Sequence, residues 1–155
     1  MLLPYDPTSK DPSGSVFDEI FLQDMLPYME STYRLRSGND FRAVAGLSRG
    51  AGWAIHFGFK YPKRFGIIGA HSPIIFREDS IMITKWLDIL PSFKMPDIFM
   101  DIGDDDPNME SFELLKQFFD QRSVPYETMS APGYHSQQYW QSQVETYIRW
   151  ITSKW

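Results

Sequence analysis

The sequence predicts an α/β fold in which a mainly parallel sheet lies between two layers of helices. Short runs of apolar and β-branched residues alternate with segments whose apolar residues recur at helical spacing. The chain has 155 residues, of which 43% are hydrophobic, enough for one core, so we expect a single domain over residues 1–155. Parallel strands need crossover helices, which bring the carboxyl ends of all strands to one edge of the sheet. Open α/β sheets bind their ligands at that edge.

The expected elements follow this alternation along the whole chain. Four strands are expected, over residues 41–45, 65–70, 97–102 and 126–129. Helices are expected over residues 16–35, 48–60, 79–90 and 109–122, followed by a last helix. The apolar residues that recur at helical spacing are Phe17, Ile20, Phe21, Met25, Tyr28 and Met29 in the first helix, and Trp140, Val144, Tyr147, Ile148 and Ile151 in the last, which should face the sheet. Pro27 lies inside the first helix, where it should kink or restart the helix because proline has no backbone N–H. Residues 4–14 form an expected exposed loop, and the long crossover 73–96 is a candidate lid.

Charge and composition exclude several kinds of function. Fifteen Lys and Arg residues against twenty Asp and Glu leave a net charge of −5, so we expect neither nucleic acid nor a membrane surface as partner. The absence of cysteine excludes disulfides, Cys-ligated metals and thiol catalysis, and we predict no metal and no cofactor. The N-terminus has neither the basic region nor the apolar run of a signal peptide. We therefore expect a soluble, cytoplasmic chain, unless a leader is missing.

One motif carries a candidate nucleophile. Residues 46–50 read Gly-Leu-Ser-Arg-Gly, a G-x-S-x-G pattern between a predicted strand and a predicted helix. Glycines permit a sharp turn there, because side chains at those positions would collide with neighbouring backbone. The turn presents the Ser48 hydroxyl at the sheet edge, and the backbone N–H of Arg49 is placed to stabilise an oxyanion. A glycine-rich turn in which Ser48 merely caps the helix is the structural alternative.

A serine nucleophile needs a base, and the chain has three histidines. His56 lies two turns into the helix after Ser48, where we expect it near the core. His71 follows the second strand, so it either lines a pocket or makes structural hydrogen bonds. His135 lies in the loop between the fourth strand and the last helix, from which it can reach Ser48. Its place late in the chain also fits the order serine, acid, histidine of hydrolase triads.

Three consecutive aspartates, Asp104, Asp105 and Asp106, follow the third strand. Like charges so close together repel one another unless cations or hydrogen bonds offset them. Two of them are expected to be a solvated turn that caps the next helix, and no further oxygen ligands nearby suggest a metal site. We expect one of the three to orient the imidazole of His135.

With these residues in hand, the chain resembles the putative esterase family, the esterase D-like branch of the α/β-hydrolases that includes feruloyl esterases and S-formylglutathione hydrolases. Residues 42–66 look like the family's nucleophile elbow, helix and following strand, and residues 21–35 are similar to the helix before the elbow. The stretch 103–106, Gly-Asp-Asp-Asp, resembles a G-x-x-D signature, which selects Asp106 as the triad acid. Residues 132–135 with the downstream Trp140 look like the family's histidine loop.

The resemblance covers the C-terminal part of the family fold. Leu2-Leu3-Pro4 looks like the end of the family's fourth strand, which implies a truncated fold that lacks the first strands and the loop donating a second oxyanion N–H. Strand 41–45 is then an edge, apolar on both faces, and we expect it to pair with a second copy of the chain. Arg49, Ala51 and Gln137 depart from the residues usual in the family, on the oxyanion side and after the histidine.

The resemblance implies a serine ester hydrolase that acts on small acyl, aryl or sugar esters through a Ser48–His135–Asp106 triad and an acyl-enzyme. Trp53, His71 and Trp140 are the candidate substrate-binding residues, although aromatic residues near a sheet edge also pack in cores. Two alternatives stay open. In the first, the chain is a weak or inactive hydrolase remnant that acts as an oligomeric binding module. In the second, it is a fragment of a longer esterase.

Overall fold

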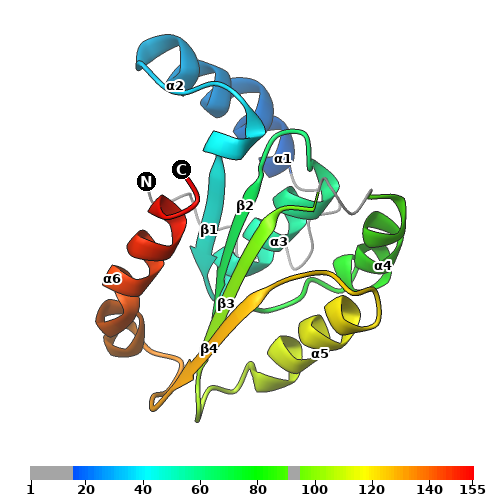
Figure 1. The fold of residues 1–155 in the computed structure, drawn as a ribbon, viewed down its shortest axis with the longest axis vertical. Helices are drawn as coiled ribbons and strands as arrows, with labels where there is room; N and C mark the ends of the chain where they lie inside the picture. The colour runs from blue at the N-terminus through cyan, green and yellow to red at the C-terminus, as the bar shows by residue number, and fades with distance from the viewer. Residues whose placement is uncertain (1–15, 91–94) are drawn as a thin grey trace.

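The computed structural model describes residues 16–90 and 95–155, and four parallel strands form its central sheet (Figure 1). The strands lie in the order β1 (Ala43–Leu47), β2 (Ile67–His71), β3 (Asp97–Gly103) and β4 (Glu127–Ala131). β1 begins two residues later than predicted because Asn39–Phe41 form a short 3-10 turn, η2. The predicted loop 4–14, the strand end at residues 2–4 and part of the candidate lid, residues 91–94, lie outside the described residues.

Helices cover both faces of the sheet, which confirms the predicted three-layer α/β/α fold. α3 (Arg49–Lys60), α4 (Asp79–Ile89) and α5 (Met109–Asp120) lie on one side, and α6 (Gln137–Thr152) lies on the other (Figure 1). The larger core joins α3, α4 and α5 to the strands through fully buried side chains, among them Ile55, Ile68, Ile83, Met100 and Leu115. In the candidate lid, α4 lies against α3 and joins the larger core through Ile83 and Leu87.

The first predicted helix is interrupted before Pro27. The helical stretch runs through α1 (Phe17–Glu19), a π-helical segment η1 (Ile20–Met25) and α2 (Leu26–Thr32). The N–H of Leu26 bonds to the carbonyl of Phe21, five residues back, so the chain is wound more loosely where proline follows. Pro27 then lies in the first turn of α2, which is where a helix tolerates it. The helix ends at Thr32, short of the predicted Leu35.

The inner faces of two helices differ from the prediction. On the first helical stretch Phe17 and Phe21 pack against Phe57 of α3, whereas Ile20, Tyr28 and Met29 are exposed. On α6 the predicted Tyr147 is buried and Ile151 packs against the core, but the predicted Val144 and Ile148 are exposed. The buried face instead includes Tyr139 and Trp150, so it is rotated from the face that the apolar spacing indicated.

The two edge strands of the described sheet differ in character. β1 pairs only with β2 in this part of the chain, and its Ala45 and Leu47 are exposed. β4 forms the opposite edge and carries Glu127, Thr128 and Ser130 as its exposed residues. Polar side chains protect an edge strand from pairing, so β1 is the less protected edge.

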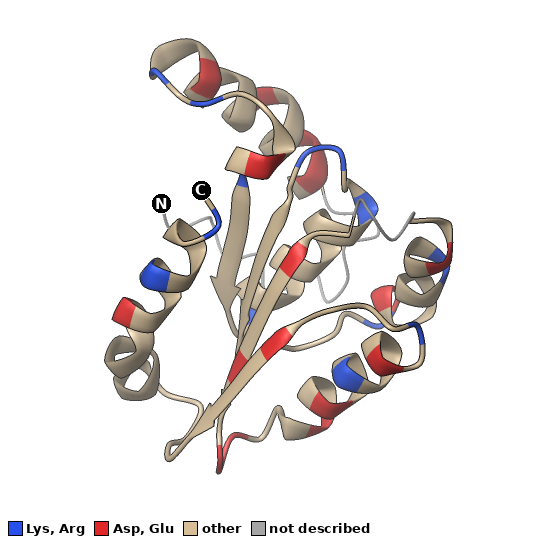
Figure 2. Cartoon of the chain, viewed as in Figure 1, with Lys and Arg blue, Asp and Glu red and all other residues tan. Residues whose placement is uncertain are grey.

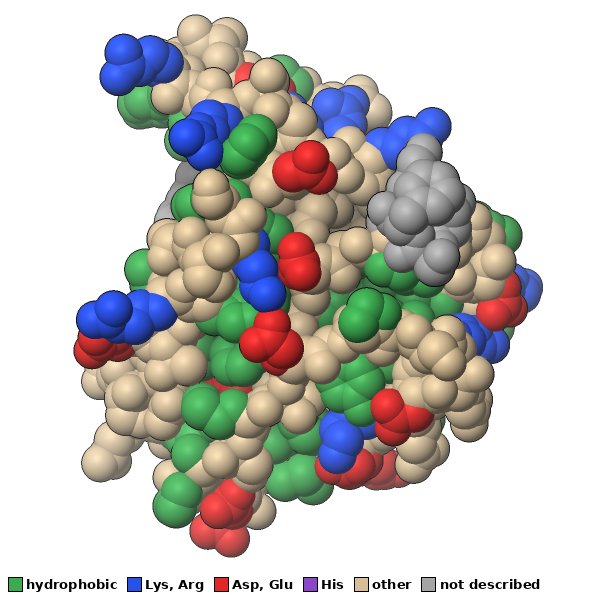
Figure 3. Space-filling view, viewed as in Figure 1, with side chains coloured by type: hydrophobic (Ala, Val, Ile, Leu, Met, Phe, Trp, Pro, Cys, Tyr) green, Lys and Arg blue, Asp and Glu red, His purple; other side chains and the backbone are tan. Residues whose placement is uncertain are grey.

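Charged residues are spread over the described elements. In Figure 2, Lys and Arg occur on several helices and loops, while acidic residues mark the turn after β3. On the face drawn in Figure 3, basic and acidic side chains alternate with apolar ones. None of the helices in the described part of the chain has the length and apolar character needed to cross a membrane.

Candidate active site

Ser48 lies in a strained turn between β1 and α3. Its backbone has φ 55° and ψ −116°, a conformation that residues other than glycine rarely adopt. The Ser48 N–H continues the sheet by bonding to the carbonyl of His71, 2.8 Å away, and the Ser48 carbonyl accepts from the N–H of Ala51 in the first turn of α3. The serine is therefore fixed by a strand on one side and a helix on the other.

The two glycines of the motif have different roles. A Cβ atom on Gly46 would lie 2.2 Å from the carbonyl oxygen of Gly50, so the close approach of strand and helix requires glycine at position 46. A Cβ atom on Gly50 would meet no atom within 4 Å. The predicted steric reason therefore holds for Gly46 and is wrong for Gly50.

The structure brings Ser48, His135 and Asp106 together from three separate strand ends. The Nε2 atom of His135 lies 2.8 Å from the Ser48 Oγ atom. On the other side of the ring, Nδ1 lies 3.0 Å from both carboxylate oxygens of Asp106. An ionised carboxylate only accepts hydrogen bonds, so this contact places a proton on Nδ1 and leaves Nε2 as the acceptor for the serine hydroxyl.

Asp106 differs from its two neighbours by burial. Its side chain is fully buried, whereas Asp104 and Asp105 are exposed. Oδ1 of Asp106 also accepts the backbone N–H of Asn108 at 2.8 Å. Asp104 accepts the hydroxyl of Ser130 instead. Of the three aspartates, Asp106 is thus the one that faces His135.

Asn108, Ser72 and Trp140 hold the surroundings of the triad. The Asn108 amide donates to the carbonyl of Ser72 at 3.1 Å, and its nitrogen lies 3.5 Å from Nδ1 of His135. The indole N–H of Trp140 donates to the hydroxyl of Ser72 at 2.9 Å. The Trp140 ring meets the His135 ring edge-on, with centroids 4.9 Å apart. Trp140 was predicted from the sequence, whereas Asn108 and Ser72 were missed because they carry no motif of their own.

Arg49, the candidate oxyanion residue, occupies the first position of α3 directly after Ser48. Backbone N–H groups at a helix N-terminus carry partial positive charge, which suits a developing oxyanion. The guanidinium group of Arg49 lies over the ring of Phe76, 5.9 Å from its centre.

The other two candidate substrate-binding residues lie in aromatic clusters. Trp53 contacts the rings of Phe17, Phe57 and Phe76 and the imidazole of His56. His71 is buried at the end of β2, where its Nδ1 atom lies 2.6 Å from the carboxylate of Asp101. His71 was predicted either to line a pocket or to make structural hydrogen bonds, and its burial against Asp101 favours the second interpretation.

His56 belongs to a buried ionic cluster between α1, α3 and α4. Its Nδ1 atom lies 2.9 Å from Asp79, and its Nε2 atom lies 3.2 Å from Asp18. Lys60 and Tyr61 also donate to Asp18, at 2.6 and 2.8 Å. Burial by itself lowers the pKa of His56, but its hydrogen bonds with Asp18 and Asp79 outweigh burial and raise that pKa. The same contacts with His56, Lys60 and Tyr61 overcome burial and hold the pKa of Asp18 below its ordinary value.

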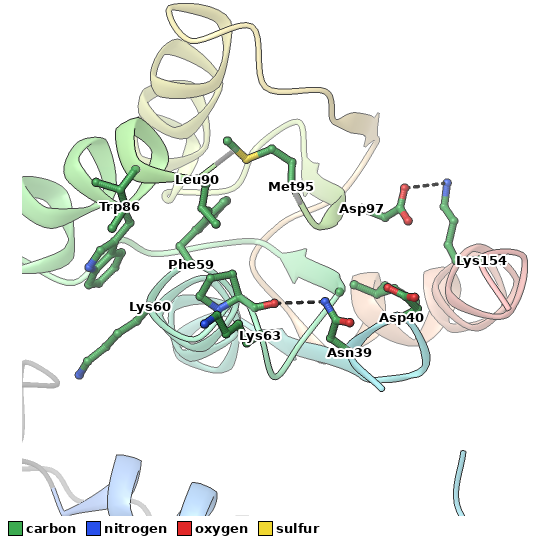
Figure 4. Close-up of a pocket in the computed structure, with 14 residues that line it drawn as sticks. Asn39, Asp40, Phe59, Lys60, Lys63, Trp86, Leu90, Met95, Asp97 and Lys154 are labelled. Atoms are coloured by element: carbon green, nitrogen blue, oxygen red, sulfur yellow. Dashed lines mark hydrogen bonds and ion pairs between the residues drawn. The ribbon is translucent and has the colours of Figure 1, made fainter. Parts of the chain in front are cut away.

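Figure 4 shows a cavity of about 830 Å³ that lies at the amino ends of β2 and β3, whereas Ser48 follows the carboxyl end of β1. Its lining includes the first residues of β2 and β3, Ile67 and Asp97, together with Asn39 and Lys154. Asn39 donates to the carbonyl of Pro62 at 3.3 Å, and Lys154 lies 3.8 Å from Asp97. Over residues 16–90 and 95–155, no three His, Asp or Glu side chains are grouped so as to hold a metal ion.

Similarity to known proteins shows the family to which the chain belongs. The sequence model of the family described as "Putative esterase" matches residues 4–151, nearly the whole chain. The chain belongs to the putative esterase family. Two curated relatives, Esterase MT1326 and Esterase Rv1288 from two strains of Mycobacterium tuberculosis, are each 30% identical over 74 residues. That match covers 47% of this chain and 16% of each relative's length.

Solved structures share the fold of this putative esterase family member at lower identity. A ferulic acid esterase superposes with a TM-score of 0.78 at 24% identity, covering 90% of this chain and 61% of its own. The S-formylglutathione hydrolase FrmB from Staphylococcus aureus gives a TM-score of 0.69 at 17% identity, covering 88% of this chain and 62% of its own. This chain thus spans about three fifths of the length of these α/β-hydrolase structures.

Proposed function

We propose that this chain is a serine ester hydrolase that acts on small acyl, aryl or sugar esters. The observation that carries the proposal is the continuous hydrogen-bonded line from Ser48 Oγ through His135 to the buried carboxylate of Asp106. The strained backbone of Ser48 supports it, because strain of about 1–3 kcal/mol persists where the surrounding structure enforces it and is concentrated at active sites. Membership of the putative esterase family supports the same reaction class.

In the proposed reaction, Ser48 Oγ attacks the ester carbonyl carbon while Nε2 of His135 takes the hydroxyl proton. Asp106 keeps the ring oriented and stabilises the imidazolium that forms. As the tetrahedral intermediate collapses, the bond to the alcohol oxygen breaks, and the Nε2 proton passes to the departing alcohol. Water then attacks the carbonyl carbon of the acyl-enzyme while Nε2 of His135 takes a proton from it. The bond between the acyl group and Ser48 Oγ breaks, and the Nε2 proton passes to Oγ. This releases the acid and restores Ser48.

The negative charge on the tetrahedral intermediate needs hydrogen-bond donors. We assign one of them to the backbone N–H of Arg49 at the start of α3. The second donor would come from another, unidentified group or from a neighbouring subunit. Loss of one such donor costs about 10²–10³ in rate, so we expect modest turnover on activated esters if the second is missing.

Hydrolysis of p-nitrophenyl acetate, together with labelling by a fluorophosphonate, tests the proposal. The wild-type chain should turn over the ester and take the label, and Ser48→Ala should do neither. Ser31→Ala is a matched control, because Ser31 is exposed on α2 and bonds only within its own turn. Absence of both turnover and labelling in the wild type would favour the inactive binding module instead.

We also propose that the outer edge of β1 pairs with β1 of a second copy. The exposed Ala45 and Leu47 and the one-sided pairing of β1 support this. Light scattering should give at least a dimer mass, and Ala45→Lys should shift it towards the monomer. Thr128→Lys, on the polar edge strand β4, should leave the mass unchanged. A monodisperse wild-type monomer would contradict this pairing.

A further inference from the structure

Besides the pair of Asp106 and His135, the sheet carries a second aspartate–histidine pair, Asp101 and His71, which is buried. The Asp101 carboxylate on β3 is fully buried. Its Oδ1 atom lies 2.6 Å from Nδ1 of His71, the neighbouring residue on β2. Its Oδ2 atom accepts the hydroxyls of Tyr139 and Tyr147, both at 2.8 Å. A buried carboxylate is costly unless several donors satisfy it, so this cluster holds its members firmly.

Both tyrosines act as hydrogen-bond donors. Burial, reinforced by the charge of Asp101, raises the pKa of Tyr139 and of Tyr147, so their hydroxyls keep their protons. The two side chains lie eight residues apart on one face of α6 and meet the same carboxylate oxygen. They differ in what their rings touch.

The ring of Tyr139 supports the loop that carries His135. A Cβ atom on Gly133 would lie 2.4 Å from Cδ2 of Tyr139, so the ring lies directly against the glycine backbone. The Gly133 carbonyl accepts a hydrogen bond from the backbone N–H of Asp105, in the turn after β3, at 3.0 Å. The N–H of Tyr139 also donates to the hydroxyl of Ser136 at 3.3 Å. Tyr139 therefore contacts the loop two residues before His135 and one residue after it.

The ring of Tyr147 points into the core instead. It stacks on the imidazole of His71 with centroids 3.5 Å apart, and it contacts Phe99 of β3. Tyr147 thus shares the hydroxyl contact and the burial of Tyr139, at 6% and 4% exposure, but packs on the sheet rather than on the loop.

We propose that Tyr139, anchored to the buried Asp101–His71 pair, is a positioning residue that fixes the His135 loop and so sets the distance from Nε2 to Ser48. The proposal rests on the esterase function proposed above. Residues 132–136 alone link β4 to α6, and they must hold an imidazole within hydrogen-bond distance of a serine 87 positions away in sequence. A ring fixed at its hydroxyl end gives this short loop a rigid surface to rest on.

Tyr139→Phe and Tyr147→Phe form a matched pair that tests the proposal. Each removes one hydroxyl from the same oxygen of Asp101 and keeps the ring. Tyr139→Phe should lower kcat for p-nitrophenyl acetate by about tenfold with KM unchanged, since misplacement of catalytic groups by 1 Å costs up to about 10². Tyr147→Phe should keep the wild-type kcat. Equal kcat losses in the two variants, or no loss in either, would overturn the proposal, and thermal unfolding shows whether the two have lost similar stability.

A second readout does not depend on turnover. In ¹⁵N-histidine-labelled protein, the Nδ1 proton of His135 that faces Asp106 gives a low-field NMR signal, which His135→Gln assigns by removing it. Tyr139→Phe should shift or broaden this signal, and Tyr147→Phe should leave it unchanged. Gly133→Ala, which pushes the ring from the loop side, should act like Tyr139→Phe. If the wild type has no turnover, the esterase function fails, and this spectrum still decides the role of Tyr139: an unchanged His135 signal in Tyr139→Phe overturns it.

Discussion

The three histidines all place Nδ1 against an aspartate, yet their environments give them different roles. His135 faces Asp106, His71 faces Asp101 and His56 faces Asp79. The difference lies beyond the pair. The second nitrogen of His135 meets the hydroxyl of Ser48, and its side chain is 22% exposed. The side chain of His71 is almost fully buried and stacks on a tyrosine, and His56 meets a second carboxylate.

This comparison shows that a histidine–aspartate pair is not by itself a catalytic feature. A carboxylate orients an imidazole in all three cases, but a base needs a proton donor at its other nitrogen and access for a substrate. At His56 a second carboxylate, that of Asp18, occupies the nitrogen that a base would need for its proton donor, and the hydrogen bonds with Asp18 and Asp79 outweigh burial and raise the pKa of the ring. At His71 the pair anchors two tyrosines. Only the His135 pair combines orientation, a reactive hydroxyl and partial exposure.

Replacement of single histidines should separate the proposed catalytic pair, His135 and Asp106, most strongly from the ionic pair of His56 and Asp79. His135→Gln should lower ester turnover by about 10⁴-fold or more, because no group then takes the Ser48 proton. His56→Gln should keep kcat but lower the free energy of unfolding by about 3 kcal/mol, because it breaks a buried ionic cluster. Steady-state rates and chemical denaturation measure the two effects. A loss of kcat in folded His56→Gln would break the comparison.

Asp106→Asn tests the carboxylate of the proposed catalytic pair. The amide presents an N–H where an oxygen accepted, which favours the wrong tautomer of His135, and kcat should fall by roughly 10³–10⁴. Asp105→Asn is the matched control in the same turn, since Asp105 is exposed and its side chain does not face the imidazole. Comparable losses in both variants would mean that the charge of the turn, not the contact with His135, matters.

The strand-to-helix turn at Ser48 distinguishes the His135–Asp106 pair from the other two histidine–aspartate pairs. The two glycines of this turn, Gly46 and Gly50, test how it is built. Gly46→Ala should destabilise the fold by roughly 3 kcal/mol, because the new methyl group overlaps the Gly50 carbonyl. Gly50→Ala should be neutral or stabilising by up to about 1 kcal/mol, since there is open space and alanine favours a helix. Thermal unfolding of the two variants gives the answer. Equal destabilisation would show that the approach of strand and helix is not the constraint.

The smallest expected effect is the pH dependence of the His56 cluster. The pKa of His56 in the folded protein lies above its ordinary value of 6.5. The stability that this histidine contributes is therefore fully present below about pH 6.5 and is lost as the pH rises through its pKa in the folded protein. The lowered pKa of Asp18 keeps that carboxylate charged in mildly acidic solution. The difference in Tm between wild type and His56→Gln should thus be largest near about pH 5–6 and shrink towards alkaline pH. A difference that grows with pH would contradict an imidazolium at His56.

Much of the fold followed from local patterns. The four strands, the helices from α3 onward and the layer order agree with the alternation of apolar runs and helical spacing. Helix faces were less predictable: on α6 the pattern correctly favoured Tyr147, but it also favoured Val144 and Ile148, which are exposed, and it left out Tyr139 and Trp150, which are buried. Spacing records which residues share a side of a helix, but not which side meets the sheet, since that depends on the shape of the neighbouring elements.

The sequence by itself determined the α/β alternation, the strand-to-helix turn at Ser48 and the order of serine, acid and histidine along the chain. Only the tertiary structure decided that a Cβ atom is excluded at Gly46 but not at Gly50, and that Asp101 anchors Tyr139 beneath the His135 loop. The sequence shows Asp101 inside the apolar strand 97–103, and it shows two tyrosines, Tyr139 and Tyr147, eight residues apart. It does not show their meeting, because contacts between residues 38 and 46 positions apart depend on how β3 and α6 pack, not on any local spacing.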